Sequence, residues 1–431
     1  MVNQKQVAEP EFIILSAFGL PKEAVASNRI FGLANGLASK GHRVTLITVD
    51  LPAKSRYTYK NSQLKVFAKK PPFFSYLLRK FLDSRKKTQR LSIESLETTE
   101  RAGKLTFFKK ALETILHLFY VGHFLPIFKL YFVASQTIKK AIKEKRPVIL
   151  FASSGPGGIG LIAARLKKKY RGKLYLIQDF RDPLANNAYL KGMCFEGVIR
   201  RTEEKIITSA DLTTAVSRSV LDLLVEKPKK AYVLYNGYHE APAKKSEEVI
   251  QLSIGYFGSI YTARKKSLEA LARALKDTEF RFFYAGRNSE TVRRIFEEQG
   301  ALPNFIDLGF LSKEETLTYE QKMQILVVLK TDEDRGVFTG KFFEYLTTEK
   351  PILVIGDKDR EFNEVAQKLG GVFIVPPDPD AIRETLLTLK SATLVKRNEK
   401  EVKAFEWRNL AERFYREVLS ELLTAPESTS R

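Results

Sequence analysis

Apolar strand-like runs alternate with helical patterns along most of this chain. Glu11 to Ala17 is predicted to form a buried strand, apolar residues between Asn28 and Gly41 recur at helical spacing, and 43–49 is again an apolar strand. A strand, a helix and a strand in about forty residues form a βαβ unit. We therefore expect a parallel sheet with helices on its faces.

The same rhythm returns after residues 50–145, which are less regular. It predicts strands at 148–153, 174–178, 212–216 and 231–235, with helices at 159–170 and 196–209. Residues 241–248 combine small, proline and charged residues without an apolar period, which is typical of a linker.

A second α/β series follows this linker. Strands are predicted at 252–257, 279–285, 304–308, 325–329, 352–355 and 372–375, and helices at 266–276, 289–299, 313–321, 341–347 and 360–369. The fold class is thus α/β, with two Rossmann-like, doubly wound domains. We expect a first domain at 1–240, a linker at 241–250 and a second domain at 251–390. The helical segment 391–431 is expected to pack back on the first domain. Ligands of such sheets bind outside the carboxyl ends of the strands, which predicts a site in the cleft between the domains.

The small numbers of cysteine and histidine residues limit the disulfides and metal sites that the chain can form. The 431 residues include one cysteine, Cys194, and four scattered histidines. This composition excludes an intrachain disulfide framework and a cysteine-based zinc cluster. We therefore expect no metal site and no protein-bound cofactor.

Positive charge is concentrated in one region. The net charge is +22, and residues 51–150 carry 22 Lys and Arg against 6 Asp and Glu, a net of +16. Basic and aromatic residues alternate over 73–87, which predicts contact of Arg79, Lys80, Lys86 and Lys87 with an anionic membrane surface. The alternative is a solvated basic face. No export signal or spanning segment is apparent, so we expect a cytoplasmic protein, peripheral on the inner face of the plasma membrane.

Two motifs in the first domain have competing interpretations. The turn from Gly155 through Gly157 to Gly160 follows a strand, and Asp179 lies 19 residues beyond it, as in a dinucleotide-binding fingerprint. A tight strand-to-helix turn is the preferred interpretation, and an NAD(P)-dependent enzyme is the alternative. Asp179, Arg181 and Asp182 end the next strand, where carboxylates accept protons or bind sugar hydroxyls. The alternative is a local Asp–Arg pair that fixes the loop.

The second domain has a candidate anion site. Gly336 and Gly340 lead into a helix that begins with Lys341, so backbone N–H groups and an ammonium meet at one helix end. Glu344, one turn further, is positioned to hold ribose hydroxyls. A capped helix with a surface glutamate is the alternative.

An ordered series of motifs now resembles a known family. It comprises Arg29-Ile-Phe-Gly, Gly41-His-Arg-Val, Ala152-Ser153-Ser154, Asp179-Phe-Arg-Asp182-Pro, Asn236-Gly237-Tyr238, Tyr256-Phe-Gly258-Ser, Ala285-Gly286-Arg287 and Gly340-Lys341 with Glu344. The series is similar to GT-B glycosyltransferases of the bacterial family 4, or group 1, type, which build cell-surface polysaccharides. Residues 53–125 are not covered by the resemblance and form a basic, aromatic insert.

The resemblance implies transfer of a sugar, of hexosyl type, from a nucleotide-sugar donor to a glycan or lipid-linked acceptor. It implies retention of configuration without a metal. We expect no nucleic-acid partner, because the basic region contains no recognisable nucleic-acid-binding module. Catalytic residues would be Asp179 and Asp182. Donor-binding residues would be Gly258, Ser259, Arg264, Lys265, Gly286, Arg287, Phe338, Thr339, Gly340, Lys341 and Glu344. Acceptor residues would be Gly19, Ser153, Gly155, Gly157, Arg181 and Asn236.

The chain departs from the family pattern at two points. The usual pair of glutamates eight positions apart appears as Gly336 and Glu344, and the usual Arg-x4-Lys pair appears as Ser259 and Arg264. Neutralisation of the donor phosphates would then rest on Arg264, with Lys265 and Lys341. These departures motivate a further alternative, a catalytically inactive GT-B scaffold.

Overall fold

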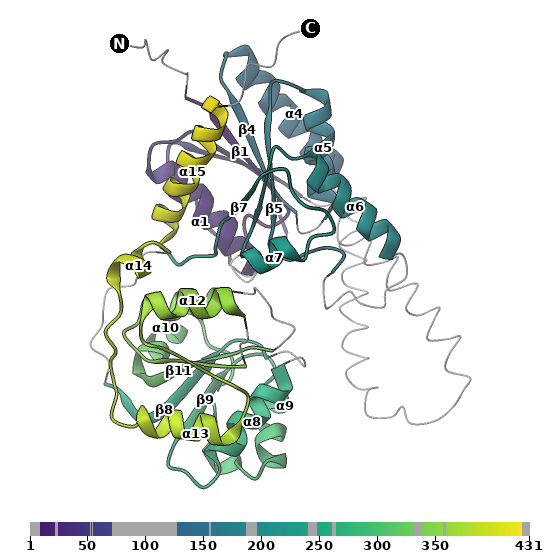
Figure 1. Ribbon diagram of the computed structural model, residues 1–431. Coiled ribbons are helices and arrows are strands. Elements are labelled where there is room, and N and C mark those ends of the chain that lie inside the picture. The colour runs from purple at the N-terminus through teal and green to yellow at the C-terminus, as the bar shows by residue number, and fades with distance from the viewer. Residues whose placement is uncertain are drawn as a thin grey trace, which may run out of the picture. The chain divides into compact units, whose positions relative to one another are not determined.

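The structure is a computed structural model, which describes residues 9–21, 25–51, 53, 55–70, 127–154, 157–186, 196–239, 248–260, 264–331, 338–356 and 359–424. The chain forms two compact units. The first consists of Met1–Leu234 together with Leu410–Arg431, and the second of Tyr235–Asn409. Figure 1 labels many of the elements of both units. The chain therefore leaves the first unit, completes the second, and then returns.

The first unit contains a parallel seven-stranded sheet in the order β3-β2-β1-β4-β5-β6-β7. Its strands are β1 (Glu11–Ser16), β2 (Val44–Val49), β3 (Leu64–Lys69), β4 (Val148–Ser153), β5 (Tyr175–Phe180), β6 (Leu212–Ala215) and β7 (Ala231–Val233). Its described helices are α1 (Val25–Ser39), α4 (Ile127–Lys143), α5 (Gly157–Lys169), α6 (Glu196–Ser209), α7 (Arg218–Asp222) and α15 (Trp407–Thr424), whose first three residues belong to the second unit.

Alternation along β1 builds two separate cores in the first unit. Ile13 and Leu15 pack with residues of α4 and α5 on one face of the sheet. Phe12 points to the other face, where its ring lies 6.4 Å from that of Phe414 in α15. Figure 1 shows α15 beside α1 on this face. The last helix of the chain thus completes the core of the first unit.

The second unit contains a parallel six-stranded sheet in the order β10-β9-β8-β11-β12-β13. Its strands are β8 (Ile250–Phe257), β9 (Arg281–Ala285), β10 (Phe305–Asp307), β11 (Met323–Leu329), β12 (Ile352–Ile355) and β13 (Val372–Val375). Its described helices are α8 (Lys265–Leu275), α9 (Ser289–Glu298), α10 (Lys313–Lys322), α11 (Gly340–Tyr345), α12 (Arg360–Leu369), α13 (Pro379–Thr388) and α14 (Glu399–Lys403), with a 3₁₀ turn at Leu302–Asn304.

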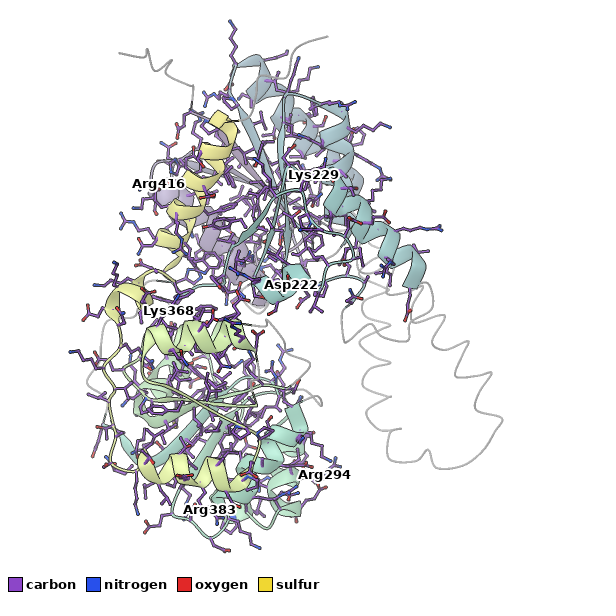
Figure 2. The ribbon with its side chains drawn as sticks, viewed as in Figure 1. Asp222, Lys229, Arg294, Lys368, Arg383 and Arg416 are labelled. Atoms are coloured by element: carbon purple, nitrogen blue, oxygen red, sulfur yellow. The ribbon has the colours of Figure 1, made fainter. Side chains whose placement is uncertain are left out.

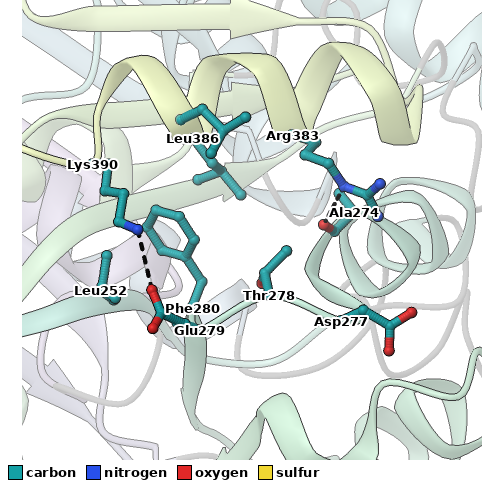
Figure 3. A pocket seen from close by; sticks show the side chains of 10 residues that line it. Leu252, Ala274, Asp277, Thr278, Glu279, Phe280, Arg383, Leu386 and Lys390 are labelled. Carbon is teal, nitrogen blue, oxygen red and sulfur yellow. Dashed lines mark hydrogen bonds and ion pairs between the residues drawn. The ribbon is translucent and has the colours of Figure 1, made fainter.

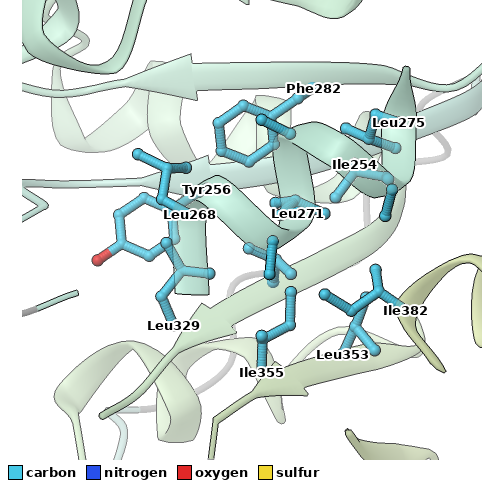
Figure 4. Packing of buried hydrophobic residues seen from close by; sticks show 14 of the residues in the cluster. Ile254, Tyr256, Leu268, Leu271, Leu275, Phe282, Leu329, Leu353, Ile355 and Ile382 are labelled. Atoms are coloured by element: carbon cyan, nitrogen blue, oxygen red, sulfur yellow. The ribbon is translucent and has the colours of Figure 1, made fainter. Parts of the chain in front are cut away.

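Each face of the second sheet has its own core. Ile254 and Phe282 pack with α8, α9 and α13, including Leu271 and Ile382, as Figure 4 shows. The other face is rich in aromatic residues, among them Phe342 and Phe362, whose ring centroids are 4.8 Å apart. Charged side chains such as Arg294 and Lys368 point outward (Figure 2). Helices therefore cover both faces, as a parallel sheet requires.

Side-chain caps explain where several helices begin. Ser312 accepts a hydrogen bond from Glu315 N while the Glu315 side chain accepts from Ser312 N, which is a complete capping box for α10. Asp359 caps α12, and Asp378 caps α13 directly before a proline. At each of these capping residues a loop ends, and the cap fixes the direction in which the following helix begins.

The predicted fold class is confirmed, and the differences lie in single elements. The sequence pattern did not identify β3, α4, α7 or α13. β3 is an edge strand whose residues alternate irregularly between buried and exposed, so it lacks a clear strand signature. α4 begins at Ile127 and lies within residues 50–145, where the sequence shows no regular apolar pattern.

Candidate functional site

The loop after β8 brings a lysine from α11 to a glycine backbone. Gly258 has a φ of +136°, a conformation that favours glycine, and its N–H donates to the carbonyl of Ala285 at 2.6 Å. A Cβ at this position would overlap the Lys341 ammonium. Glycine here therefore makes room for Lys341 at the carboxyl end of β8.

Tyr256 holds two cations around this loop. The Lys341 ammonium lies 5.5 Å from the centre of the Tyr256 ring, and Arg264 Nη1 donates to the Tyr256 hydroxyl at 3.3 Å. That hydroxyl in turn donates to the carbonyl of Ser259 at 3.3 Å. The structure thus brings together Gly258, Ser259, Arg264 and Lys341 from the predicted donor set.

Lys265 behaves differently from these two cations. Its ammonium pairs with Glu269 at 3.4 Å, one turn further along α8, and its side chain is half exposed. The neighbouring Arg264 is 9% exposed and directed to Tyr256. The geometry therefore supports Arg264 more than Lys265 as a phosphate ligand.

The loops after β9 and β10 lie at the same carboxyl end of the sheet as the loop after β8. A Cβ at Gly286 would overlap the Gly258 carbonyl, so these two glycine loops lie in direct contact. The Arg287 guanidinium lies 6.0 Å from the centre of the Phe310 ring, which is 69% exposed. Phe310 was not identified from the sequence, because a single exposed phenylalanine after a short strand has no distinguishing pattern.

The approach to α11 serves packing as well as the site. Thr339 caps the helix by accepting from Phe342 N at 3.3 Å, and Gly340 begins the helix. The Phe338 side chain is buried among aromatic rings, so it is unavailable to a ligand. Asn236, which was predicted to face the acceptor, donates to the Phe338 carbonyl at 3.2 Å.

Glu344 belongs to a cluster of titratable groups. Its carboxylate pairs with Lys313 of α10 at 2.9 Å. Burial lowers the pKa of His239 to about 4, with Lys313 lowering it further and Glu344 opposing the shift. Glu320, also on α10, is 1% exposed. Sequence reasoning missed Lys313 and Glu320, because α10 has an unremarkable surface pattern, and it missed His239, a single histidine after β7 that belongs to no motif.

Asp179 is enclosed at the end of β5 in the first unit. Arg29 donates to both of its oxygens, at 2.6 and 3.0 Å, and Ser153 and Thr214 donate at 3.0 and 2.9 Å. The side chain is fully buried. This environment supports the alternative of a structural Asp–Arg pair, although the partner is Arg29 and not Arg181.

The burial of Asp179 also argues against the alternative of a dinucleotide-binding site. A ribose would need to reach Asp179, whose oxygens already accept hydrogen bonds within the protein. At Gly160 a Cβ would lie 2.6 Å from Ser154 Oγ, so this glycine is required by packing. Gly157 begins α5, whereas Gly155 lies outside the described residues. The geometry therefore favours a tight structural turn.

Asp182 and Arg181 lie just beyond the strand. Asp182 is exposed, so it is the more accessible of the two predicted catalytic carboxylates. The Arg181 guanidinium lies 5.6 Å from the centre of the Phe18 ring. Burial lowers the pKa of Arg181, while Asp182 and Asp179 act in the opposite direction. A Cβ at nearby Gly19 would lie 2.7 Å from Thr48 Oγ1.

A pocket of about 230 Å³ lies at the opposite end of the strands of the second sheet, near the starts of β8 and β9 (Figure 3). Leu252, Phe280 and Leu386 supply apolar lining, and the Lys390–Glu279 ion pair lies at 3.1 Å. Arg383 donates to the carbonyl of Ala274 at 3.2 Å, which ties α13 to the end of α8. None of the predicted site residues lines this pocket.

The described residues contain no group of three or more His, Cys, Asp or Glu side chains arranged to hold a metal ion. In that same part of the chain, every helix is too short or too polar to cross a bilayer. The predicted membrane residues Arg79, Lys80, Lys86 and Lys87 lie outside the described ranges.

Comparison with known proteins identifies the fold. No family model and no curated protein sequence matches the chain. Sucrose-phosphate synthase from Thermosynechococcus elongatus matches with a TM-score of 0.58 and 14% identity, over 97% of this chain and 100% of that one. Anabaena HepE, in complex with UDP-glucose, matches with a TM-score of 0.59 and 11% identity, over 95% and 99%. The lipopolysaccharide outer core galactosyltransferase WaaB matches with a TM-score of 0.54 and 13% identity, over 95% and 99%.

These likenesses extend over nearly the whole length of each protein, and they agree with the two parallel sheets described above. At such low identity they concern structure and leave the substrates open. The chain has the GT-B glycosyltransferase fold, as the sequence predicted.

Proposed function

We propose that this protein is a glycosyltransferase that binds a nucleotide-sugar donor on its second unit and transfers a hexosyl group to a glycan or lipid-linked acceptor. The single observation that carries the proposal is the approach of the Lys341 ammonium to the Gly258 backbone, with Arg264 held by the same tyrosine. Two cations beside a glycine loop suit a diphosphate.

The donor would lie along the carboxyl ends of β8 and β9. Arg264 and Lys341 would neutralise the diphosphate, with Ser259 and Gly340 supplying backbone contacts and Thr339 holding α11 in place. Gly258 and Gly286, whose N–H groups donate to the carbonyls of Ala285 and Gly309, would shape the loops of this site. Arg287 and Phe310 present a flat surface on which a nucleobase could stack. Glu344 would hold the ribose. HepE has been solved with UDP-glucose, which makes this compound the first donor to test.

The acceptor would bind the first unit, near Gly19, Arg181 and Asp182. We assign proton chemistry to Asp182, which is exposed, and a positioning role to the buried Asp179 with Ser153. Transfer without a metal would follow if Arg264 and Lys341 stabilise the leaving diphosphate, and retention of configuration is carried over from the family resemblance. The basic 73–87 segment would bring the enzyme to the cytoplasmic face of an anionic membrane during polysaccharide synthesis.

Calorimetric titration with UDP and GDP tests the donor assignment. We expect wild type to bind one of these nucleotides, and Lys341→Ala and Arg264→Ala to bind it at least about tenfold more weakly, since each removes one charged phosphate contact. Lys368→Ala, a change on the exposed face of α12, is the matched control and should bind like wild type. Failure of wild type to bind either nucleotide would remove the donor assignment.

Transfer itself separates an active enzyme from an inactive scaffold. The scaffold alternative rests on Gly336, which stands where the family pattern has a glutamate. With UDP-glucose and membranes from the source cells, an active enzyme releases UDP in step with sugar incorporation. Binding of UDP without any release would favour the scaffold.

A further inference from the structure

Glu320 is a buried carboxylate that the donor-site assignment does not use. It lies near the end of α10 and is 1% exposed. Its Oε2 atom has no hydrogen-bond partner among the residues that the structure describes. A buried carboxylate oxygen without a partner is costly when ionised, so this position needs an explanation.

The groups around Glu320 are those of the donor site. Lys313 of its own helix and Lys341 and Glu344 of α11 all act electrostatically on its carboxyl group. Tyr345, also on α11, is affected by Glu320 in turn and accepts from Phe257 N of β8 at 3.3 Å. Beyond these groups, Glu344 acts electrostatically on His239, and the Lys341 ammonium lies 5.5 Å from the centre of the Tyr256 ring. Glu320 is therefore coupled to the cation that we assign to the diphosphate.

Burial and Glu344 together favour the protonated form of this carboxyl group. Burial is the larger cause and Glu344 the second, and they raise the pKa of Glu320 to about 8, although Lys313 and Lys341 oppose the shift. The group thus changes charge about two pH units above the point at which a terminal phosphate loses its last proton.

We propose that Glu320 is a positioning residue of the donor site, and that it must be protonated for Lys341 to engage the diphosphate of a bound nucleotide. The inference rests on the proposed function and deepens it. When Glu320 is neutral, the charge of Lys341 is available to the phosphates. When Glu320 is ionised, it attracts Lys341 and repels the incoming diphosphate.

The proposal fixes the direction of proton movement. A diphosphate adds negative charge near Glu320, which disfavours the ionised carboxylate, so binding takes up a proton. At pH 8, where about half of Glu320 is ionised in the free protein, the uptake should approach half a proton per bound nucleotide. The affinity should fall about fourfold between pH 6.5 and pH 8.5.

Calorimetry of the full chain measures both effects. Titration of UDP, or of GDP if that is the nucleotide bound, in two buffers of different ionisation enthalpy at pH 8 gives the number of protons taken up. This measurement needs no variant, so it remains decisive even if substitutions at Glu320 fail to fold. Absence of proton uptake by wild type at pH 8 would overturn the proposal.

Variants locate the proton. Glu320→Gln keeps the shape of the side chain without its charge, and should bind the nucleotide with the same affinity at pH 6.5 and pH 8.5 and with no proton uptake. Glu314→Gln, an exposed change on the same helix, is the matched control and should keep the wild-type pH dependence. An unchanged pH dependence in Glu320→Gln would assign the proton elsewhere and refute the proposal.

The two proposals fail in different ways. If wild type binds no nucleotide at any pH, the donor assignment itself is wrong. If it binds with pH-independent affinity, the donor assignment stands and the role of Glu320 falls.

Discussion

Two buried carboxylates, one in each unit, have opposite surroundings. Asp179 in the first unit receives hydrogen bonds from Arg29, Ser153 and Thr214, so its negative charge is paired inside the protein. Glu320 in the second unit is equally buried, yet one of its oxygens has no partner within the described residues. The first arrangement stabilises a fold, whereas the second leaves a charge that can respond to a ligand.

The contrast extends to the loops around each carboxylate. In the first unit, the glycine at 160 is required by packing against Ser154. In the second, Gly258 accommodates the ammonium of Lys341, a charged group at the end of the sheet. Substitutions in the first set should therefore change stability, and substitutions in the second should change ligand binding.

The largest effect is expected for Arg29→Ala, which leaves Asp179 charged and buried without its partner. The free energy of unfolding should fall by about 3–5 kcal/mol, measured by urea denaturation followed by circular dichroism. Arg43→Ala removes an ion pair to Glu11 at 3.8 Å in which the arginine is 38% exposed, and should cost less than about 1 kcal/mol. Equal losses in both variants would contradict the contrast.

The next effect concerns stability as a function of pH. Because burial and Glu344 raise the pKa of Glu320 to about 8, the folded state holds this proton more tightly than the unfolded chain does. Stability from this group is therefore present at low pH and is lost as the pH rises toward about 8. Between pH 5 and pH 9, Glu320→Gln should gain on the order of 3 kcal/mol relative to wild type in urea unfolding.

The exposed neighbour provides the comparison for this measurement. Glu314→Gln, on the same helix, should show a constant difference from wild type over this pH range. A parallel course of the wild-type and Glu320→Gln curves would show that the carboxyl group at 320 titrates normally.

Gly258→Ala should weaken nucleotide binding about 30-fold, or about 2 kcal/mol, because the added Cβ displaces Lys341. Titration calorimetry with UDP measures it. Gly41→Ala is the control, since Gly41 also has a positive φ, +89°, but has open space around its Cβ position. That variant should lose about 1 kcal/mol of stability and no affinity. Normal binding by Gly258→Ala would place the diphosphate elsewhere.

The smallest effect is expected at Phe310. Its exposed ring, stacked with Arg287, should contribute about 1 kcal/mol to a nucleobase, so Phe310→Ala should bind UDP about fivefold more weakly. Phe132→Ala, a change of a similarly exposed aromatic in the first unit, should leave binding unchanged. A larger loss with pyrophosphate than with UDP would rule out a contact to the base.

The sequence predicts most strands of the sheets well because they are short, continuous apolar runs. The predicted bounds of 148–153, 352–355 and 372–375 agree with β4, β12 and β13. β3 was missed because it is an edge strand with charged residues, and α13 because no helical period was recognised after Pro376 and Pro377. A continuous apolar run in the sequence marks a strand that is buried on both faces. β3 is not such a strand, so its sequence lacks this signal.

The candidate site was less accessible to sequence reasoning. Lys341 and Gly258 were both identified, yet 83 positions separate them in the sequence, and only the fold reveals that one makes room for the other. Arg29 was noted as part of a motif without its partner, because ion pairs between distant segments leave no local signal. Glu320 has neighbours from another helix, and its burial follows from packing that no periodicity encodes.

The return of α15 to the first unit has a consequence for synthesis on the ribosome. Phe414 covers Phe12 and Phe151, with ring centroids 6.4 and 5.9 Å apart, so one face of the first sheet stays open until this helix emerges. The end of α15 lies 191 residues beyond the end of β7, a stretch that takes roughly 10 to 40 seconds to translate. During this interval the nascent chain exposes an apolar surface that chaperones recognise. The unit that is translated first is therefore the last to be completed.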